Sequence, residues 1–217
     1  GSAYVYVRSN GVWSEQAKLT ASDGSEMDYF GCSVSIGGDT AVIGAQYDVV
    51  NGLMPGSAYV FVRSNGVWSE QQKLTASDGA GSDLFGYSVS IDGDTAVIGA
   101  RLDDANDSGS AYVFARSNGV WTEQQKLTAS DGDDGDTFGS SVSIDGDTAV
   151  IGARLDDDNA NNSGSAYIFP IAPQQVETPA SVTGATSANV DIGGFTFGSL
   201  QATDVDGLTD GTYFTVS

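Results

Sequence analysis

One segment is repeated along the chain almost unchanged, and this repetition limits the possible folds more than any other feature. The segment reads GSAYVYVRSNGVW from Gly1, GSAYVFVRSNGVW from Gly56 and GSAYVFARSNGVW from Gly109, and it begins again as GSAYIFP at Gly164. The copies start roughly 55 residues apart, and a period of this size is typical of propellers and stacked arrays. The chain is therefore expected to fold as a series of similar units.

Each unit contains four segments of strand length, rich in the Val, Ile, Tyr, Phe and Thr that favour strands. In the second copy these segments span 56–63, 68–76, 85–91 and 94–100. Two of the connections, Ser64-Asn65-Gly66 and Asp92-Gly93, use residues that accept the positive φ of tight hairpins. Successive strands are then antiparallel neighbours. The sequence predicts an all-β fold of four-stranded antiparallel meander repeats of the β-propeller type.

The run FGYSVSIDGDTAVIGA, from Phe85 to Ala100, precedes a polar loop and GSAYVF and resembles the FG-GAP repeat. That family is named after a Phe-Gly pair and a later Gly-Ala-Pro, and it builds the propeller of integrin alpha chains. The Phe-Gly pair is matched at 30–31, 85–86 and 138–139, and the Gly-Ala pair at 44–45, 99–100 and 152–153. Gln46, Arg101 and Arg154 stand where the family has Pro. The resemblance covers about residues 1–170 and implies propeller blades.

The repeats begin and end in the middle of a blade. Counted from Phe-Gly, the chain opens with the last two strands of one blade, continues with complete blades at 30–76 and 85–129, and ends with three strands at 138–169. This predicts a partial or open propeller, because a closed ring needs at least about four blades. Three interpretations stay open: a fragment of a longer propeller, a head-to-tail polymer whose end strands complete one another, and a small ring closed on itself.

After Phe169 the repeat is lost. We expect FG-GAP-like repeats over 1–170, with units from 1, 56, 109 and a partial one from 164, then a linker over 171–187 and a β-rich tail over 188–217. The linker prediction rests on the Pro, Ala, Thr and Ser content of PIAPQQVETPASVTG. ATDVDGLTDGTYFTVS is similar to the cadherin-like or VCBS-type modules of large bacterial surface proteins. Such a module needs roughly 100 residues, so the tail is interpreted as part of one or as a donated strand.

Composition argues against several classes of function. The net charge is −21, from 29 acidic and 8 basic residues, so binding to nucleic acid or to an anionic membrane is disfavoured. No apolar run reaches the length of a membrane span, and no membrane insertion is expected. The chain has no histidine and a single cysteine, Cys32, which removes histidine-based catalysis and histidine zinc sites. We expect a protein without enzymatic activity, located outside the cell or on a bacterial surface.

The acidic loops are the strongest chemical candidates. Calcium takes six to eight oxygen ligands, which Asp and Asn on Gly-containing loops can supply. The candidate calcium ligands are Asp131, Asp133, Asp136, Asp156, Asp158 and Asn159 in the repeats, and Asp204, Asp206 and Asp210 in the tail. A solvated acidic surface and a plain Asp-Gly turn are the alternatives. The integrin-type motif Asp-x-Asp-x-Asn-Gly between the first two blade strands is missing.

The two ends of each blade are expected to differ in charge. Alternate loops of a meander share one face, so the acidic loops before GSAY and before Phe-Gly lie together. The opposite face carries Arg8, Arg63 and Arg116. The recurring aromatics are Tyr59, Phe61 and Trp68, repeated as Tyr112, Phe114 and Trp121. Their recurrence favours packing between blades, with a carbohydrate-stacking surface as the alternative.

These observations predict a structural or adhesive repeat protein that presents a rigid acidic β surface. One alternative is a subunit of an extracellular filament that polymerises head to tail by strand complementation between chains. Another is a glycan-binding module of a large bacterial adhesin. The expected partners are copies of the chain itself, other surface proteins or glycans.

Overall fold

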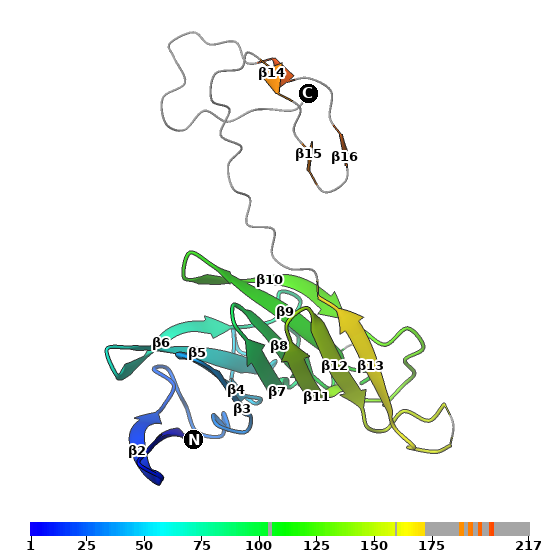
Figure 1. The fold of residues 1–217 in the computed structure, drawn as a ribbon. Coiled ribbons are helices and arrows are strands. Elements are labelled where there is room, and N and C mark those ends of the chain that lie inside the picture. The colour runs from blue at the N-terminus through cyan, green and yellow to red at the C-terminus, as the bar shows by residue number, and fades with distance from the viewer. Residues whose placement is uncertain are drawn as a thin grey trace. The chain divides into compact units, whose positions relative to one another are not determined.

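The computed structural model describes residues 1–103, 106–158 and 160–171, together with four two-residue strands further along the chain. Within these residues every regular element is a β-strand and none is a helix (Figure 1). This confirms the predicted all-β class. The chain divides into two compact units, Gly1–Pro173 and Gln174–Ser217.

The first unit contains four antiparallel sheets, each made of consecutive strands. The first hairpin comprises β1 (Ala3–Ser9) and β2 (Val12–Leu19). The first blade comprises β3 (Val34–Gly37), β4 (Thr40–Ala45), β5 (Ser57–Ser64) and β6 (Val67–Leu74). The second blade comprises β7 (Phe85–Asp92), β8 (Thr95–Ala100), β9 (Ser110–Ser117) and β10 (Val120–Leu127). The third sheet comprises β11 (Phe138–Asp145), β12 (Thr148–Ala153) and β13 (Ser165–Pro170). The predicted phasing of half a blade, two blades and three strands is confirmed.

Short turns set the antiparallel order. Asn65 and Gly66 have φ values of 50° and 80° and connect β5 to β6, with Ser64 opposite Val67. Gly93, with a φ of 54°, connects β7 to β8 in the same way. The predicted hairpins are therefore confirmed. This register leaves the long acidic loops together at one end of each sheet, here called the loop end, and the short turns at the other, here called the turn end.

Neighbouring sheets pack face to face through apolar side chains that recur in each unit. Val42 and Val60 of the first blade share one buried cluster with Phe85 and Tyr112 of the second blade. An equivalent cluster joins the second blade to the third sheet, and another joins the first hairpin to the first blade. The core is thus a chain of similar layers between sheets, as expected for stacked blades.

Glycine in the Gly-Ala pair permits these layers to approach closely. A Cβ placed on Gly44 would stand 1.9 Å from the carbonyl oxygen of Gly86 in the next blade. That same carbonyl accepts a hydrogen bond of 2.7 Å from the Ser33 hydroxyl. Gly99 meets Gly139 in the same manner, with a Cβ distance of 2.1 Å. The Phe-Gly strand of one sheet therefore lies directly on the Gly-Ala strand of the sheet before it.

The outer face of the third sheet lacks such a neighbour among the described residues. A Cβ on Gly152 would meet only the side chain and carbonyl of Ser141. Ile168 is 72% exposed, whereas its equivalent Val113 in the second blade is 2% exposed. This face is the surface on which a further blade would pack.

The second unit has two short strand pairs. β14 (Ser187–Ala188) pairs with β17 (Leu200–Gln201), and β15 (Asp191–Ile192) pairs with β16 (Phe195–Thr196). Apart from Ile171 and these strands, the predicted linker and tail lie outside the described residues. A search of the described residues found no helix of the length and apolarity that a membrane crossing requires.

Candidate functional site at the acidic loop end

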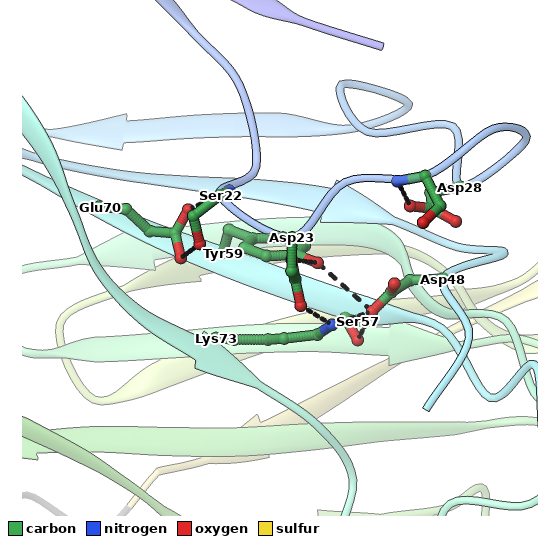
Figure 2. Close-up of polar contacts among 9 residues, drawn as sticks. Ser22, Asp23, Asp28, Asp48, Ser57, Tyr59, Glu70 and Lys73 are labelled. Atoms are coloured by element: carbon green, nitrogen blue, oxygen red, sulfur yellow. Dashed lines mark hydrogen bonds and ion pairs between the residues drawn. The ribbon is translucent and has the colours of Figure 1, made fainter. Parts of the chain in front are cut away.

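A network of charged side chains closes the loop end of the first blade (Figure 2). Tyr59 on β5 lies opposite Lys73 on β6 in the strand register. The Lys73 Nζ atom lies 2.6 Å from a carboxylate oxygen of Asp23 and 2.6 Å from one of Asp48. The Tyr59 hydroxyl donates to Asp23 over 2.7 Å, and the Ser57 hydroxyl donates to Asp48. One ammonium group therefore compensates two carboxylates that come from different loops.

Burial makes this compensation necessary. The side chain of Asp48 is only 5% exposed, while those of Lys73 and Asp23 are 25% and 51% exposed. Burial opposes ionisation of Asp23, but hydrogen bonds from Lys73 and Tyr59 hold its pKa below the usual value. Burial would also lower the pKa of Lys73, yet its hydrogen bonds to Asp23 and Asp48 raise that pKa. The Asp23 carboxylate and the Lys73 ammonium group are thus both held in their charged forms at neutral pH.

The second blade repeats the arrangement. The Tyr112 hydroxyl lies 2.7 Å from Asp78 and 2.6 Å from Asp103. The Lys126 Nζ atom lies 2.9 Å from Asp78 and 2.7 Å from Asp103. Burial again opposes ionisation of Asp78, and hydrogen bonds from Lys126 and Tyr112 lower its pKa. Because the network recurs in both complete blades, it is a structural feature of the repeat.

The third sheet keeps the carboxylates and the tyrosine but has no lysine at this point in its described part. The Tyr167 hydroxyl lies 2.8 Å from Asp131 and 2.7 Å from Asp156. Asp156 is 2% exposed, and the hydrogen bond from Tyr167 lowers its pKa. The charges of Asp156 and Asp131 raise the pKa of Asp158. Neither Asp131 nor Asp156 forms an ion pair within the described residues, so the charge of this pair is not balanced there by a cation.

The predicted calcium ligands have several different roles. Asp131 and Asp156 meet at one tyrosine hydroxyl. Asp136 is 5% exposed and accepts a hydrogen bond of 2.7 Å from the backbone amide of Asp133. The backbone amide of Asp158 donates to Asp156 over 3.2 Å. These contacts bring Asp156 together with Asp131 and with Asp158, and Asp136 together with Asp133.

Four predicted ligands, Asn159, Asp204, Asp206 and Asp210, lie outside the described residues. Among the residues that the structure does describe, no group of three or more Asp, Glu, Cys or His side chains is arranged to hold a metal ion. Calcium binding therefore stays a prediction.

The buried position of Asp136 also recurs in the earlier loops. Asp28 and Asp83 are 3% and 5% exposed. Asp28 accepts a hydrogen bond from the Ser25 amide, and Asp83 accepts one of 2.5 Å from the Ala80 amide. Each carboxylate accepts a hydrogen bond from the backbone amide three residues earlier and so closes its own loop. This recurrence indicates a structural role at all three positions.

The turn end of each blade carries arginine, as the sequence predicted. Arg63 pairs with Asp39 and Arg116 pairs with Asp94, each with a distance of 2.6 Å. In each pair the arginine lies near the end of the third strand of the blade. The aspartate lies in the turn between the first and second strands of the same blade. Arg8 lies opposite its own repeat's tryptophan in the register of the first hairpin. Arg63 and Arg116 are therefore each paired with an aspartate of the same blade.

The recurring aromatic side chains pack inside the complete blades. The largely buried rings, 0–4% exposed, are Tyr59, Phe61, Tyr112, Phe114 and Trp121. Trp68 is partly exposed, and its Nε1 atom donates to Gln16 over 2.9 Å. Trp121 donates to Gln71 in the same way over 3.0 Å. Of the two interpretations from the sequence, this burial supports packing between blades.

The same aromatic positions are open in the first hairpin. Tyr4, Tyr6 and Trp13 are 50%, 53% and 64% exposed. They correspond to Tyr59, Phe61 and Trp68. Tyr59 and Phe61 pack against Phe30, and Trp68 contacts Gln16 of the preceding hairpin. The first hairpin has neither kind of neighbour among the described residues, which accounts for the exposure.

An acidic cleft of about 550 Å³ opens beside the network of the second blade. Its lining includes Asp78, Asp83, Asp103 and Asp107. Burial and the charge of Asp103 raise the pKa of Asp83. The cleft therefore has a negative potential, which disfavours the binding of anions.

Sequence reasoning missed Lys73 and Lys126. The available signal was that Lys18, Lys73 and Lys126 occupy the same position of the repeat, in a chain with only 8 basic residues. The aspartate of every SDG segment, such as Asp23, recurs equally regularly. Positions that recur in all units are the natural partners of one another when a blade forms.

The FG-GAP repeat family matches residues 13–61, 68–114 and 121–169. These segments cover more than half of the chain, and the repeated blades show why the motif residues are needed. The chain belongs to the FG-GAP repeat family. A search of curated proteins found no match. FG-GAP repeats are typically extracellular or surface domains, and they are consistent with an adhesion-type repeat protein. The cadherin-like or VCBS-type module that the sequence predicts in the tail lies beyond the matched segments and stays a prediction.

Proposed function

We propose that this chain is a non-enzymatic structural or adhesive protein that acts outside the cell by presenting a rigid acidic β surface. The observation that carries the proposal is the lysine-centred network in both complete blades. Lys73 and Lys126 each join two acidic loops to the last strand of the blade. The loops are thereby fixed to the sheet, and a fixed loop surface favours binding because little conformational entropy is lost.

The charge that remains after pairing supports the same proposal. Asp23 and Asp78 are still 51% and 48% exposed. They recur one blade apart, so the surface offers carboxylates at regular intervals. Such a surface is suited to basic partners and to anionic partners bridged by calcium, which we propose as its accessory ion.

Adhesion under flow tests this proposal. Particles coated with the chain are passed over cell-envelope preparations, with and without added calcium. Changing the exposed loop-end acids Asp133→Asn and Asp134→Asn together should lower retention, because both lie on the acidic surface. The matched control changes Asp145→Asn and Asp147→Asn at the turn end, and should retain particles as well as the unchanged chain. Equal retention by all three proteins would show that the acidic loop end is not the adhesive surface.

A second candidate function is a subunit of an extracellular filament. The favouring observation is that β1 and β13 each pair with only one strand in the described part of the chain. An unpaired edge is a template for another strand, and a head-to-tail contact that does not close continues as a filament. Light scattering across a concentration series should give a mass that grows with concentration. A constant monomer mass would contradict this candidate.

A further inference from the structure

We propose that the third sheet is an acceptor for a lysine-bearing β-strand of another polypeptide, which adds antiparallel to β13 and places its ammonium group between Asp131 and Asp156. This inference goes beyond the proposed structural role, because presenting an acidic surface does not require a partner strand.

The second blade shows how the acceptor is filled. In that blade Lys126 on β10 lies opposite Tyr112 on β9 and contacts two carboxylates within 2.9 Å. In the third sheet Tyr167 on β13 contacts the equivalent carboxylates of Asp131 and Asp156 within 2.8 Å. The tyrosine and both acids are therefore already in the positions that receive a lysine. What differs is the last strand, which the described third sheet does not contain.

No cationic side chain of the described residues compensates Asp131 and Asp156. Asp156 is 2% exposed, and a buried carboxylate without a cation is unfavourable. No lysine follows Lys126 in the sequence, and neither lysine nor arginine follows Arg154. Residues 171–217 thus contain neither lysine nor arginine. Lys126 is itself engaged in the second blade.

The backbone of β13 offers the second half of the acceptor. β13 pairs with β12 on one side, and no described strand lies on its other side. Exposed edges of this kind bind extended peptides through main-chain hydrogen bonds, with side chains providing specificity. The charged pair beside Tyr167 supplies that specificity here. Because the ammonium groups of the complete blades lie at this point, charge complementarity favours a lysine-bearing strand over a neutral one.

The chain's own last strands define the pattern of the partner. In the second blade Leu127 follows Lys126, lies opposite Ala111 and is 2% exposed. The equivalent of Ala111 in the third sheet is Ala166, which is exposed. A partner strand therefore needs lysine opposite Tyr167, followed by a large apolar residue opposite Ala166.

Peptide binding to the full 217-residue chain tests the proposal. The probe is a labelled synthetic peptide with the sequence SNGVWTEQQKLTAS, which copies residues 117–130, and its fluorescence anisotropy is measured at rising chain concentration. Saturable binding is expected. Replacing the peptide's lysine by glutamine should weaken binding about tenfold or more, because a hydrogen-bonded charge is lost. Asp156→Asn in the chain should weaken it similarly, and Asp134→Asn, which removes an exposed acid of the neighbouring loop, should not.

Hydrogen exchange supplies a readout that a misfolded variant cannot imitate. The peptide should slow exchange at the backbone amides of β13, and the lysine-free peptide should do so less. Asp131→Asn serves as a second variant, because Asp131 is exposed and its substitution should leave the fold intact. Self-association of the chain that is lost in Lys18→Gln would support the acceptor and identify β2 of a second copy as a donor.

Three results would overturn the proposal. The first is no binding of the peptide, and the second is equal binding of the lysine and glutamine peptides. The third is calcium binding that Asp156→Asn abolishes while peptide affinity is unchanged, which would make the carboxylate pair a metal site. None of these results would affect the adhesion assay, so the two proposals fail independently.

Discussion

Replacing Lys73 by methionine tests how much the charged network contributes to stability. The change removes the ammonium group that lies 2.6 Å from Asp23 and from Asp48 and keeps most of the apolar stem. Asp48 is 5% exposed and would retain only the Ser57 hydroxyl and a 3.4 Å contact with Tyr59. Removing one partner of a buried pair costs about 3–5 kcal/mol, whereas an exposed pair contributes about 0–1 kcal/mol. Lys73 is 25% exposed, so we expect a loss of about 2–3 kcal/mol.

The assay is urea unfolding followed by tryptophan fluorescence, with thermal unfolding beside it. The expected loss corresponds to a Tm lower by roughly 4–12 °C for a chain of this size. Lys18→Met is the matched control, because Lys18 is the same repeat position in the first hairpin. Lys18 lies 5.6 Å above the Tyr4 ring, and no ion pair is formed by it within the described residues. Its loss should cost less than about 1 kcal/mol.

A double variant separates lost attraction from stranded charge. If Lys73→Met leaves Asp48 charged and buried, then adding Asp48→Asn should recover part of the lost stability. Equal losses in Lys73→Met and Lys18→Met would refute the reasoning. The reasoning would also be refuted if the two substitutions were additive, so that Asp48→Asn lowered the free energy of unfolding as much in the Lys73→Met variant as in the unchanged chain.

Three further expectations follow from the packing and the ionisation of the blades. Gly44→Ala should destabilise the chain by more than about 3 kcal/mol, because its Cβ would stand 1.9 Å from a backbone oxygen. In the control Gly152→Ala the nearest atom to the new Cβ belongs to the Ser141 side chain. The control should therefore lose less stability in the same urea titration. Trp121→Ala should cost about 3–5 kcal/mol, and Trp13→Ala, at an exposed position, within about 0.5 kcal/mol; similar losses would mean that Trp121 is not a core residue. The lowered pKa of Asp23 adds stability that is complete above the unfolded-state value of about 3.9 and is lost as the pH falls through the folded-state value. The urea midpoint should therefore drop between about pH 5 and pH 2, and a midpoint that stays constant over this range would contradict the ionised network.

Much of the fold could be predicted because its signals are local. The hairpin at Asn65 and Gly66 depends on the φ values that those two residues accept, and the structure has both with positive φ. Strand positions follow from alternating burial within each short segment, as in β6. The repeat then gave the number and phasing of the sheets, since equal segments form equal units. The Gly-Ala pair was recognisable in the sequence as a motif. The need for glycine at this position was not, because it arises from the carbonyl of Gly86 in the next blade, which lies against Gly44.

The chemistry of the acidic loops could not be predicted in the same way. The sequence predicts Asp131, Asp136 and Asp156 as calcium ligands because aspartates on Gly-containing loops supply oxygen atoms, and this stays a prediction. What the sequence did not reveal is that Asp131 and Asp156 share the Tyr167 hydroxyl and that Asp136 accepts a hydrogen bond within its own loop. Their equivalents in the complete blades meet a lysine that is distant in sequence from both.

The sequence by itself determined the strands, the turns and the succession of similar sheets, because these depend on conformations of neighbouring residues. Only the tertiary structure decided which charges meet. Asp23, Asp48 and Lys73 belong to two loops and a strand, and they come together when β5 and β6 pair and the preceding loop folds across them. That encounter depends on non-local packing. So does the different arrangement at Tyr167, where Asp131 and Asp156 meet and the described part of the third sheet has no fourth strand.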